Sequence, residues 1–215
     1  MEDHQERIGD VVGDYRIQRW LGGGTFGTVY LAEHVRDGGQ VAIKVLNIRL
    51  TNSEQLRGFL NEARTMRLRH PHIMPLLDFG LGREDTPFLV MEYASKGTLR
   101  DRHPRGSRIP LPTVLVYTAQ VASALQYAHE QRLVHRDVKP ENMFFRSDDV
   151  ILLSDFGIAT TVHTTGSYSS TSSAPGIGGT VLYMAPEQLR GQPRAASDQY
   201  ALGIVCYEWL TGSPP

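Results

Sequence analysis

The chain has 215 residues, of which 40% are hydrophobic and 21% charged, so it can bury the core of one large domain or two small lobes. Its 22 basic and 23 acidic residues nearly cancel, which argues against nucleic acid or an anionic membrane as a partner recognised by overall charge. The single cysteine excludes an internal disulfide. The polar N-terminus does not resemble a signal peptide, and no stretch has the roughly 20 apolar residues of a membrane span, so we expect no membrane contact from this segment.

Strands are predicted for most of residues 15–46. The strings "YRIQRWL", "TVYLAEH" and "QVAIKVL" show partial alternation, and "GGGTFG" and "RDGG" separate them as turns. The period changes to that of a helix over 54–69, with three apolar residues on one face: Phe59, Ala63 and Met66. A capping box of Thr51 and Glu54 is expected to begin this helix. "IMPLLDFG" and "PFLVMEYA" predict two further strands, which gives a first lobe of about five strands.

The second half begins with a polar stretch rich in Gly and Pro and then becomes helical. The string "TVLVYTAQVASALQYAHEQR" predicts a helix with one apolar face, formed by Val114, Tyr117, Val121, Leu125 and Ala128. Residues 160–179 are dense in Ser, Thr and Gly and predict a mobile loop. The string "SDQYALGIVCYEWLTG" is apolar nearly all round, which predicts a helix buried in a core, with Cys206 as a small hydrophobic residue.

Three glycines, Gly22, Gly24 and Gly27, have the spacing G-x-G-x-x-G. This spacing fits a glycine-rich hairpin turn as well as a loop that approaches phosphates. A dinucleotide fingerprint would open a helix, whereas "TVYLAEH" continues as a strand, so a nicotinamide-dependent enzyme is not favoured. Lys44 lies on the next strand, where its cation could reach a nucleotide or simply lie in solvent.

Four further features follow in one order: Glu62 in the predicted helix, "HRDVKPEN", "DFG" and "APE". Together with the glycine loop and "VAIK" they resemble the signature of eukaryotic-like serine/threonine protein kinases. The wider strings "DFGIA" and "GGTVLYMAPEQ" are most similar to the bacterial receptor-type branch, and the resemblance runs from about Tyr15 to the last residue.

The resemblance implies an α+β, bilobal protein-kinase fold. It implies an N-terminal extension over 1–14, a lobe with a small antiparallel β-sheet and one main helix over 15–94, and a mostly helical lobe over 95–215. Later helices of the family are absent from the chain, so the second lobe is expected to be incomplete. Glu187, which pairs with an Arg of a later helix in the family, would then be a buried carboxylate without its partner.

The resemblance also implies transfer of the γ-phosphoryl group of ATP to Ser or Thr hydroxyls of proteins, with Mg²⁺ as the metal and Mn²⁺ as an alternative. Asp137 would accept the proton of the hydroxyl, and Lys139 would contact the transferring phosphate. Asn142 and Asp155 would hold the metal ions. Lys139 and Thr180 match the serine/threonine pattern but leave dual specificity open.

The nucleotide would be bound mostly by the first lobe, where Lys44 would contact the α- and β-phosphates and pair with Glu62. The resemblance assigns the remaining contacts to Leu21, Gly22, Gly24, Gly27, Val29, Ala42, Met91, Glu92, Ala94 and Phe144. His135 has a structural role in this interpretation, packed beside Phe156.

Regulation by phosphorylation is a further expectation. Arg136 precedes Asp137, and in relatives with this arrangement the Arg belongs to a basic cluster that binds a phosphorylated loop residue. The candidates in the middle of the loop are Ser169, Ser170, Thr171, Ser172 and Ser173. The alternative is that these hydroxyls only keep a linker soluble. Self-association for autophosphorylation is an expected partner interaction.

Two alternatives remain within the resemblance. A pseudokinase would be expected to have lost at least one of the catalytic residues, and all are present. A small-molecule phosphotransferase would generally lack "APE" and the long loop before it. We therefore expect a cytoplasmic enzyme whose partners are ATP and protein substrates, and the family leaves room for a membrane span beyond residue 215 of the whole protein.

Overall fold

The structure is a computed structural model that describes residues 7–24, 27–50, 52–65, 67–156 and 181–215. The chain divides into two compact units. Of the described residues, the first unit holds those within 7–68 and 75–93, and the second holds 69–74, 94–156 and 181–215.

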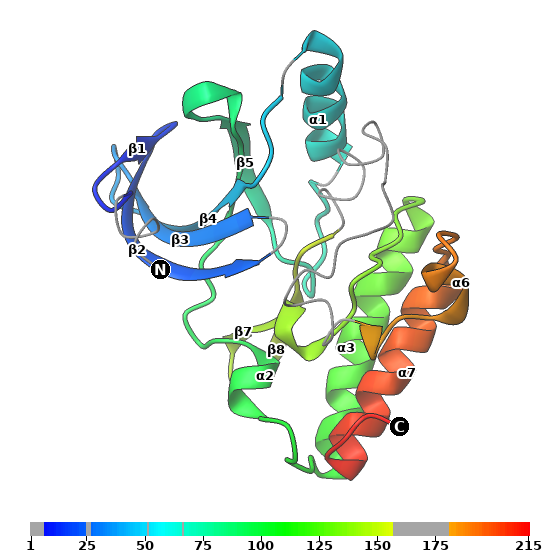
Figure 1. Cartoon of the computed structure of the whole chain (residues 1–215). Helices are drawn as coiled ribbons and strands as arrows, with labels where there is room; N and C mark the ends of the chain where they lie inside the picture. Colours follow the sequence, from blue (N-terminus) through cyan, green and yellow to red (C-terminus); the bar gives the residue numbers. More distant parts are fainter. Residues whose placement is uncertain (1–6, 25–26, 51, 66, 157–180) are drawn as a thin grey trace. The chain divides into compact units, whose positions relative to one another are not determined.

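The first unit contains a curled antiparallel sheet with the strand order β1-β2-β3-β4-β6-β5 (Figure 1). Its strands are β1 (Val11–Val12), β2 (Tyr15–Gly24), β3 (Gly27–His34), β4 (Gln40–Leu46), β5 (Leu76–Leu81) and β6 (Pro87–Glu92), with a short 3₁₀ turn η1 (Arg83–Asp85) before β6. The five longer strands confirm the sequence prediction. The sequence pattern missed β1, because two residues are too few to show a periodicity.

The hairpin signal "RDGG" forms the turn between β3 and β4. Gly38 has a φ of +73°, a left-handed conformation that costs glycine nothing. The turn is closed by two backbone hydrogen bonds: Gly38 N–H donates to His34 O, and His34 N–H donates to Gly39 O, each at 2.9 Å.

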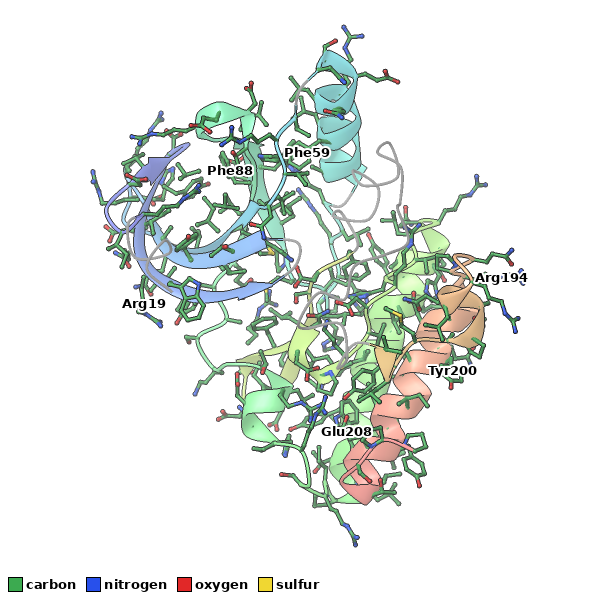
Figure 2. The ribbon with its side chains drawn as sticks, in the orientation of Figure 1. Arg19, Phe59, Phe88, Arg194, Tyr200 and Glu208 are labelled. Atoms are coloured by element: carbon green, nitrogen blue, oxygen red, sulfur yellow. The ribbon has the colours of Figure 1, made fainter. Side chains whose placement is uncertain are left out.

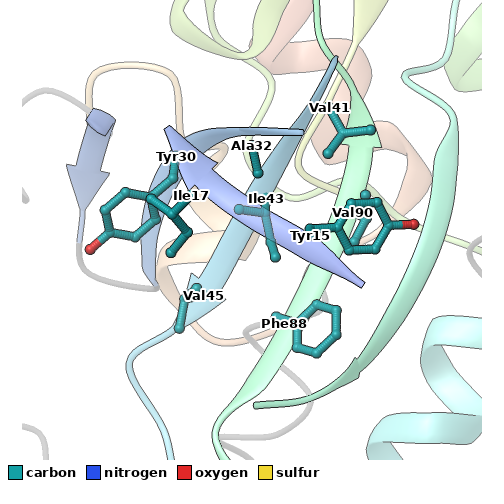
Figure 3. Close-up of a cluster of buried hydrophobic side chains, with 9 residues drawn as sticks. All are labelled: Tyr15, Ile17, Tyr30, Ala32, Val41, Ile43, Val45, Phe88 and Val90. Atoms are coloured by element: carbon teal, nitrogen blue, oxygen red, sulfur yellow. The ribbon is translucent and has the colours of Figure 1, made fainter. Parts of the chain in front are cut away.

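Alternate residues of four strands form the core of this sheet (Figure 3). The cluster consists of Tyr15, Ile17, Tyr30, Ala32, Val41, Ile43, Val45, Phe88 and Val90. Because side chains alternate between the two faces of a strand, burying one face leaves the residues in between on the other face. The second face is therefore available for other contacts.

The helix of the first unit, α1 (Ser53–Thr65), is shorter than the predicted span. It begins after Asn52, whose Oδ1 accepts a hydrogen bond of 2.9 Å from Gln55 N–H. Phe59 is fully buried and meets Phe79 of β5 edge to face, with 6.3 Å between the ring centroids. Thr51 and Met66 lie outside the described residues.

The second unit is mainly helical, with one two-stranded ribbon (Figure 1). Its elements are α2 (Leu99–Arg102), α3 (Leu111–Glu130), the 3₁₀ turn η2 (Pro140–Asn142), β7 (Met143–Ser147), β8 (Val150–Leu153), α6 (Pro186–Leu189) and α7 (Ala195–Thr211). All five residues of the predicted apolar face of α3 are buried. Tyr117 of this face meets Trp209 of α7, with 6.0 Å between the ring centroids.

The last helix, α7, lies in the core as predicted, but only one of its sides is buried. Tyr200, Tyr207 and Leu210 of α7 are 44%, 47% and 43% exposed, whereas Val205 and Glu208 are buried. Figure 2 shows Tyr200 and Glu208 on different sides of α7. The composition of a mostly apolar helix does not show which of its sides the rest of the chain covers. None of the described helices has the length and apolar character required to cross a membrane.

Glu187, at the start of α6, also differs from the expectation of an unpaired buried carboxylate. Its Oε1 accepts a hydrogen bond from Ser197 Oγ of α7, and its side chain is partly exposed. The hydrogen bond from Ser197 lowers the pKa of Glu187 below its ordinary value. The chain therefore supplies a local partner for this carboxylate.

Candidate active site

The predicted site residues fall in both units. The second unit holds Ala94, Arg136, Asp137, Lys139, Asn142, Phe144 and Asp155. The first unit holds Leu21, Gly22, Gly24, Gly27, Val29, Ala42, Lys44, Glu62, Met91 and Glu92. The predicted loop residues lie outside the described part of the chain: Ser169, Ser170, Thr171, Ser172, Ser173 and Thr180.

Asp137 is the centre of a compact polar cluster in the second unit. Its Oδ2 is 2.8 Å from Lys139 Nζ and accepts a hydrogen bond of 2.9 Å from Asn142 Nδ2. The same Nδ2 donates to the backbone oxygen of Asp137 at 2.7 Å. Oδ1 of Asp137 is buried and has no hydrogen-bond partner among the described residues. One carboxylate oxygen is thus held by two side chains, whereas the acceptor capacity of the other is unused among the described residues.

His135 fixes the backbone in front of this cluster. Its ring is fully buried, Nε2 donates to Ser154 O at 2.7 Å, and Nδ1 accepts from Asp137 N–H at 3.2 Å. Burial lowers the pKa of His135. Because Nδ1 accepts a hydrogen bond, the ring is neutral with its proton on Nε2. The ring also packs edge to face against Phe156 at 4.5 Å between centroids, which confirms the expected structural role.

Asp198 anchors the same backbone from the first turn of α7. Its Oδ2 accepts hydrogen bonds from His135 N–H and His129 Nε2, and its Oδ1 accepts one from Arg136 N–H, each at 2.8 Å. The side chain of Asp198 is 1% exposed. Sequence reasoning missed this residue. The sequence feature that could have identified it is an acidic residue in a mostly apolar helical string, because a buried charge needs partners.

Two residues of the predicted site have a left-handed backbone. Arg136 has a φ of +70° and Asp155 a φ of +63°. Such a conformation is costly for residues other than glycine and persists where the surrounding contacts fix it. At Arg136 the hydrogen bond to Asp198 supplies one such contact, and Gln188 Nε2 donates to Arg136 O at 2.5 Å.

In the first unit, strand register brings four predicted nucleotide-binding residues to one face of the sheet. Val29 of β3 lies opposite Lys44 of β4, and Ala42 lies opposite Met91 of β6. Cross-strand partners share a face, and Ala42 and Lys44 are two positions apart. These residues therefore lie on the face opposite to the buried core cluster. Of Glu62 the structure describes only the backbone, in α1.

The three glycines differ in what surrounds them. A Cβ at Gly27 would lie 2.5 Å from Val45 O, so packing against β4 alone requires glycine there. A Cβ at Gly22 or Gly24 would meet nothing within 4 Å. Of the three glycines, only Gly27 is therefore required by packing among the described residues.

The chain matches the model of the protein kinase domain over residues 15–215. It is 38% identical over 208 residues to serine/threonine-protein kinase PrkC of Bacillus subtilis, a match that covers 95% of this chain and 31% of PrkC. It is 40% identical over 219 residues to serine/threonine-protein kinase PknF of Mycobacterium tuberculosis, covering 96% of this chain and 44% of PknF. The chain thus spans less than half the length of these curated relatives.

Solved structures agree with these sequence matches. The crystal structure of the Mycobacterium tuberculosis PknI kinase domain has a TM-score of 0.72 and 34% identity, and the match covers 97% of this chain and 78% of that one. The expected α+β kinase fold is confirmed by this likeness. The chain therefore belongs to the protein kinase family, and the relatives named above are bacterial serine/threonine-protein kinases.

Proposed function

We propose that this chain is the catalytic part of an enzyme that transfers the γ-phosphoryl group of ATP to Ser or Thr hydroxyls of proteins. The arrangement of Asp137 carries the proposal. Its Oδ2 is held by Lys139 and Asn142, whereas its buried Oδ1 has no described partner. A carboxylate oriented in this way can accept a proton from a hydroxyl placed at Oδ1.

A small hollow of about 10 Å³, roughly the space of one water molecule, lies beside this carboxylate in the second unit. It is lined by Arg136, Asp137, Val138, Tyr183, Met184, Gln188 and Ala201. In the proposed reaction the hydroxyl proton passes to Oδ1 of Asp137 while the hydroxyl oxygen bonds to the γ-phosphorus. The bond from that phosphorus to the bridging oxygen breaks, and ADP leaves. Lys139 would neutralise charge on the transferred group.

Kinases use a divalent metal ion that the phosphates of the nucleotide also bind. The side-chain oxygen donors of the second unit suit such an ion. Nδ2 of Asn142 is engaged with Asp137, which leaves its Oδ1 as the metal donor. Asp155 would supply a carboxylate. No group of three His, Cys, Asp or Glu side chains is arranged as a metal site among the described residues. One carboxylate and one amide oxygen match Mg²⁺, which keeps several waters and binds substrate phosphates; bound there, it would neutralise phosphate charge.

Residues of the first unit would supply most of the nucleotide contacts. Val29, Ala42 and Met91 would pack against the adenine, and Lys44 on the same face would contact the α- and β-phosphates. Lys44 would also pair with Glu62 of α1. Backbone groups of Glu92 and Ala94 would bind the purine edge, and Leu21, Gly22, Gly24, Gly27 and Phe144 complete the proposed nucleotide contacts.

Regulation is part of the same proposal. Arg136 would bind a phosphorylated residue of the segment 160–179, ordered by a charge-assisted contact after self-association and autophosphorylation. Thr180 would contribute to the choice of Ser and Thr over Tyr. A reaction that consumes ATP favours a location in the cytoplasm.

Phosphotransfer from γ-labelled ATP to a generic Ser/Thr acceptor protein tests the proposal. Asp137→Ala should reduce turnover by about 10²- to 10⁴-fold with the affinity for ATP unchanged, because proton acceptance is lost and binding is not. Asp149→Ala removes an exposed carboxylate on the turn after β7 and is the matched control. A wild-type chain that transfers no label, or an Asp137→Ala variant with full turnover, would refute the assignment.

A further inference from the structure

A buried cluster around Arg100 has no part in the proposed reaction, although it reaches the segment that carries Asp137. From α2, Arg100 Nε donates to Glu141 Oε1 at 2.9 Å and Nη1 donates to Glu208 Oε1 at 2.8 Å. Nη2 donates to Tyr183 Oη at 2.8 Å, and Tyr183 Oη donates to Glu208 Oε2 at 2.6 Å. The guanidinium of Arg100, on α2, thus contacts η2, α7 and the residue Tyr183 that precedes α6.

Arg100 and Glu208 form a buried ion pair, whereas the Glu141 side chain that Arg100 also contacts is 38% exposed. The side chains of Arg100 and Glu208 are 17% and 4% exposed. Burial alone would raise the pKa of Glu208, but hydrogen bonds from Arg100 and Tyr183 bring it below its ordinary value. Both groups are therefore charged near neutral pH, and each holds the other in a planar, bidentate geometry that a Lys could not reproduce.

Glu141 connects the cluster to the proposed catalytic residues. It is the middle residue of η2, with Lys139 just before the turn and Asn142 at its end. Both of these neighbours contact Oδ2 of Asp137. Asn142 N–H also donates to Lys139 O at 3.0 Å, which closes the turn between these two residues. Fixing the Glu141 side chain would therefore also fix the backbone from which the side chains of Lys139 and Asn142 extend toward Asp137.

We propose that Arg100 is a positioning residue for phosphoryl transfer: it ties Glu141 to the buried Glu208 and keeps η2 at the distance that lets Lys139 and Asn142 orient Asp137. The inference rests on the proposed function. Misplacement of a catalytic group by about 1 Å can cost about 10²-fold in rate, so a tether outside the reacting atoms can control turnover.

Arg100→Met tests this, because Met fills similar space without the hydrogen bonds. We expect kcat to fall about 10- to 100-fold while KM for ATP stays within about twofold. Arg102→Met is the matched control, since Arg102 lies on the same helix, with its guanidinium over Phe145 and near Asp148, and takes no part in the cluster. Its kcat should stay within about twofold of wild type.

A double variant separates positioning from folding. Arg100→Met alone leaves Glu208 buried without its cation, and adding Glu208→Gln removes that unpaired charge. We expect the double variant to recover thermal stability relative to Arg100→Met but not kcat, because Glu141 is still untethered. Recovery of kcat together with stability would show that Arg100 acts only through folding and would overturn the proposal.

Hydrogen exchange supplies a readout that does not require activity. In Arg100→Met, peptides that cover residues 136–145 should exchange at least about tenfold faster than in wild type and in Arg102→Met. Unchanged exchange there would overturn the inference whatever the activity. An inactive wild-type chain would instead refute the proposed function, and the exchange data would still show whether Arg100 orders the turn.

Discussion

The ring of His135 is held neutral by its surroundings, and this makes stability depend on pH at the scale of one residue. Its pKa is lowered by burial from an ordinary value of about 6.5. Below about pH 6.5 the unfolded chain therefore binds a proton that the folded chain does not. The contribution of His135 to stability is complete above that pH and is lost as the pH falls toward the lowered pKa.

The predicted slope from this ring is at most about 1.4 kcal/mol per pH unit. Denaturant unfolding at several pH values between about 8 and about 5.5 measures it, comparing wild type with His135→Phe. The variant should be less stable near pH 8, because Ser154 O and Asp137 N–H lose their partner, yet less sensitive to acid. An equal slope in both proteins would contradict the assignment.

Asn142 gives a second prediction at this scale. Asn142→Ala removes both hydrogen bonds to Asp137 and the amide oxygen proposed as a metal donor. We expect the Mg²⁺ concentration for half-maximal activity to rise by at least about 10- to 100-fold. Gln126→Ala, which removes an exposed amide from α3, should leave it unchanged. A lower kcat with unchanged Mg²⁺ dependence would limit Asn142 to orienting Asp137.

At the scale of elements, the start of α7 decides how the segment before Asp137 is held. The carboxylate of Asp198 accepts three hydrogen bonds, two of them from backbone N–H groups at the strained residue Arg136 and at His135. An amide has only one acceptor oxygen, so Asp198→Asn leaves at least one buried donor without a partner. The geometry of the loop therefore depends on a helix that is distant in the sequence.

Asp198→Asn should lower the free energy of unfolding by about 1–3 kcal/mol. It should also lower kcat, because the strained backbone at Arg136 loses its anchor. Denaturant midpoints and turnover measured together check both effects. Asp149→Asn, an exposed site, is the control, and a variant with wild-type stability would show that the anchor is not needed.

At the scale of the whole molecule, the proposed phosphorylation joins segments that lie far apart in the sequence. Incubation with Mg-ATP should place phosphate on Ser or Thr between residues 160 and 180, because that segment is rich in hydroxyls and Arg136 is proposed to bind the phosphate. Mass spectrometry before and after incubation measures this, with Asp155→Asn as the inactive control. An active enzyme with no phosphate in this segment would rule out the proposed mechanism.

Much of the molecule follows from the sequence by itself. Periods of two and 3.6 residues predicted the five longer strands and the buried face of α3, because these patterns repeat within a few residues of the chain. The order of "HRDVKPEN", "DFG" and "APE" indicated the family. The structural role of His135 was also predicted, and its two ring hydrogen bonds account for it.

Only the tertiary structure decided which charges meet and which faces are covered. Arg100 and Glu208 are 108 positions apart, and no local pattern joins them or identifies Asp198 as the partner of His135. The one-sided burial of α7 and the need for glycine at Gly27 likewise depend on what packs against them. The period of a sequence pattern shows which side chains share a face. Which residues far apart in the sequence interact depends on the path of the chain in the tertiary structure.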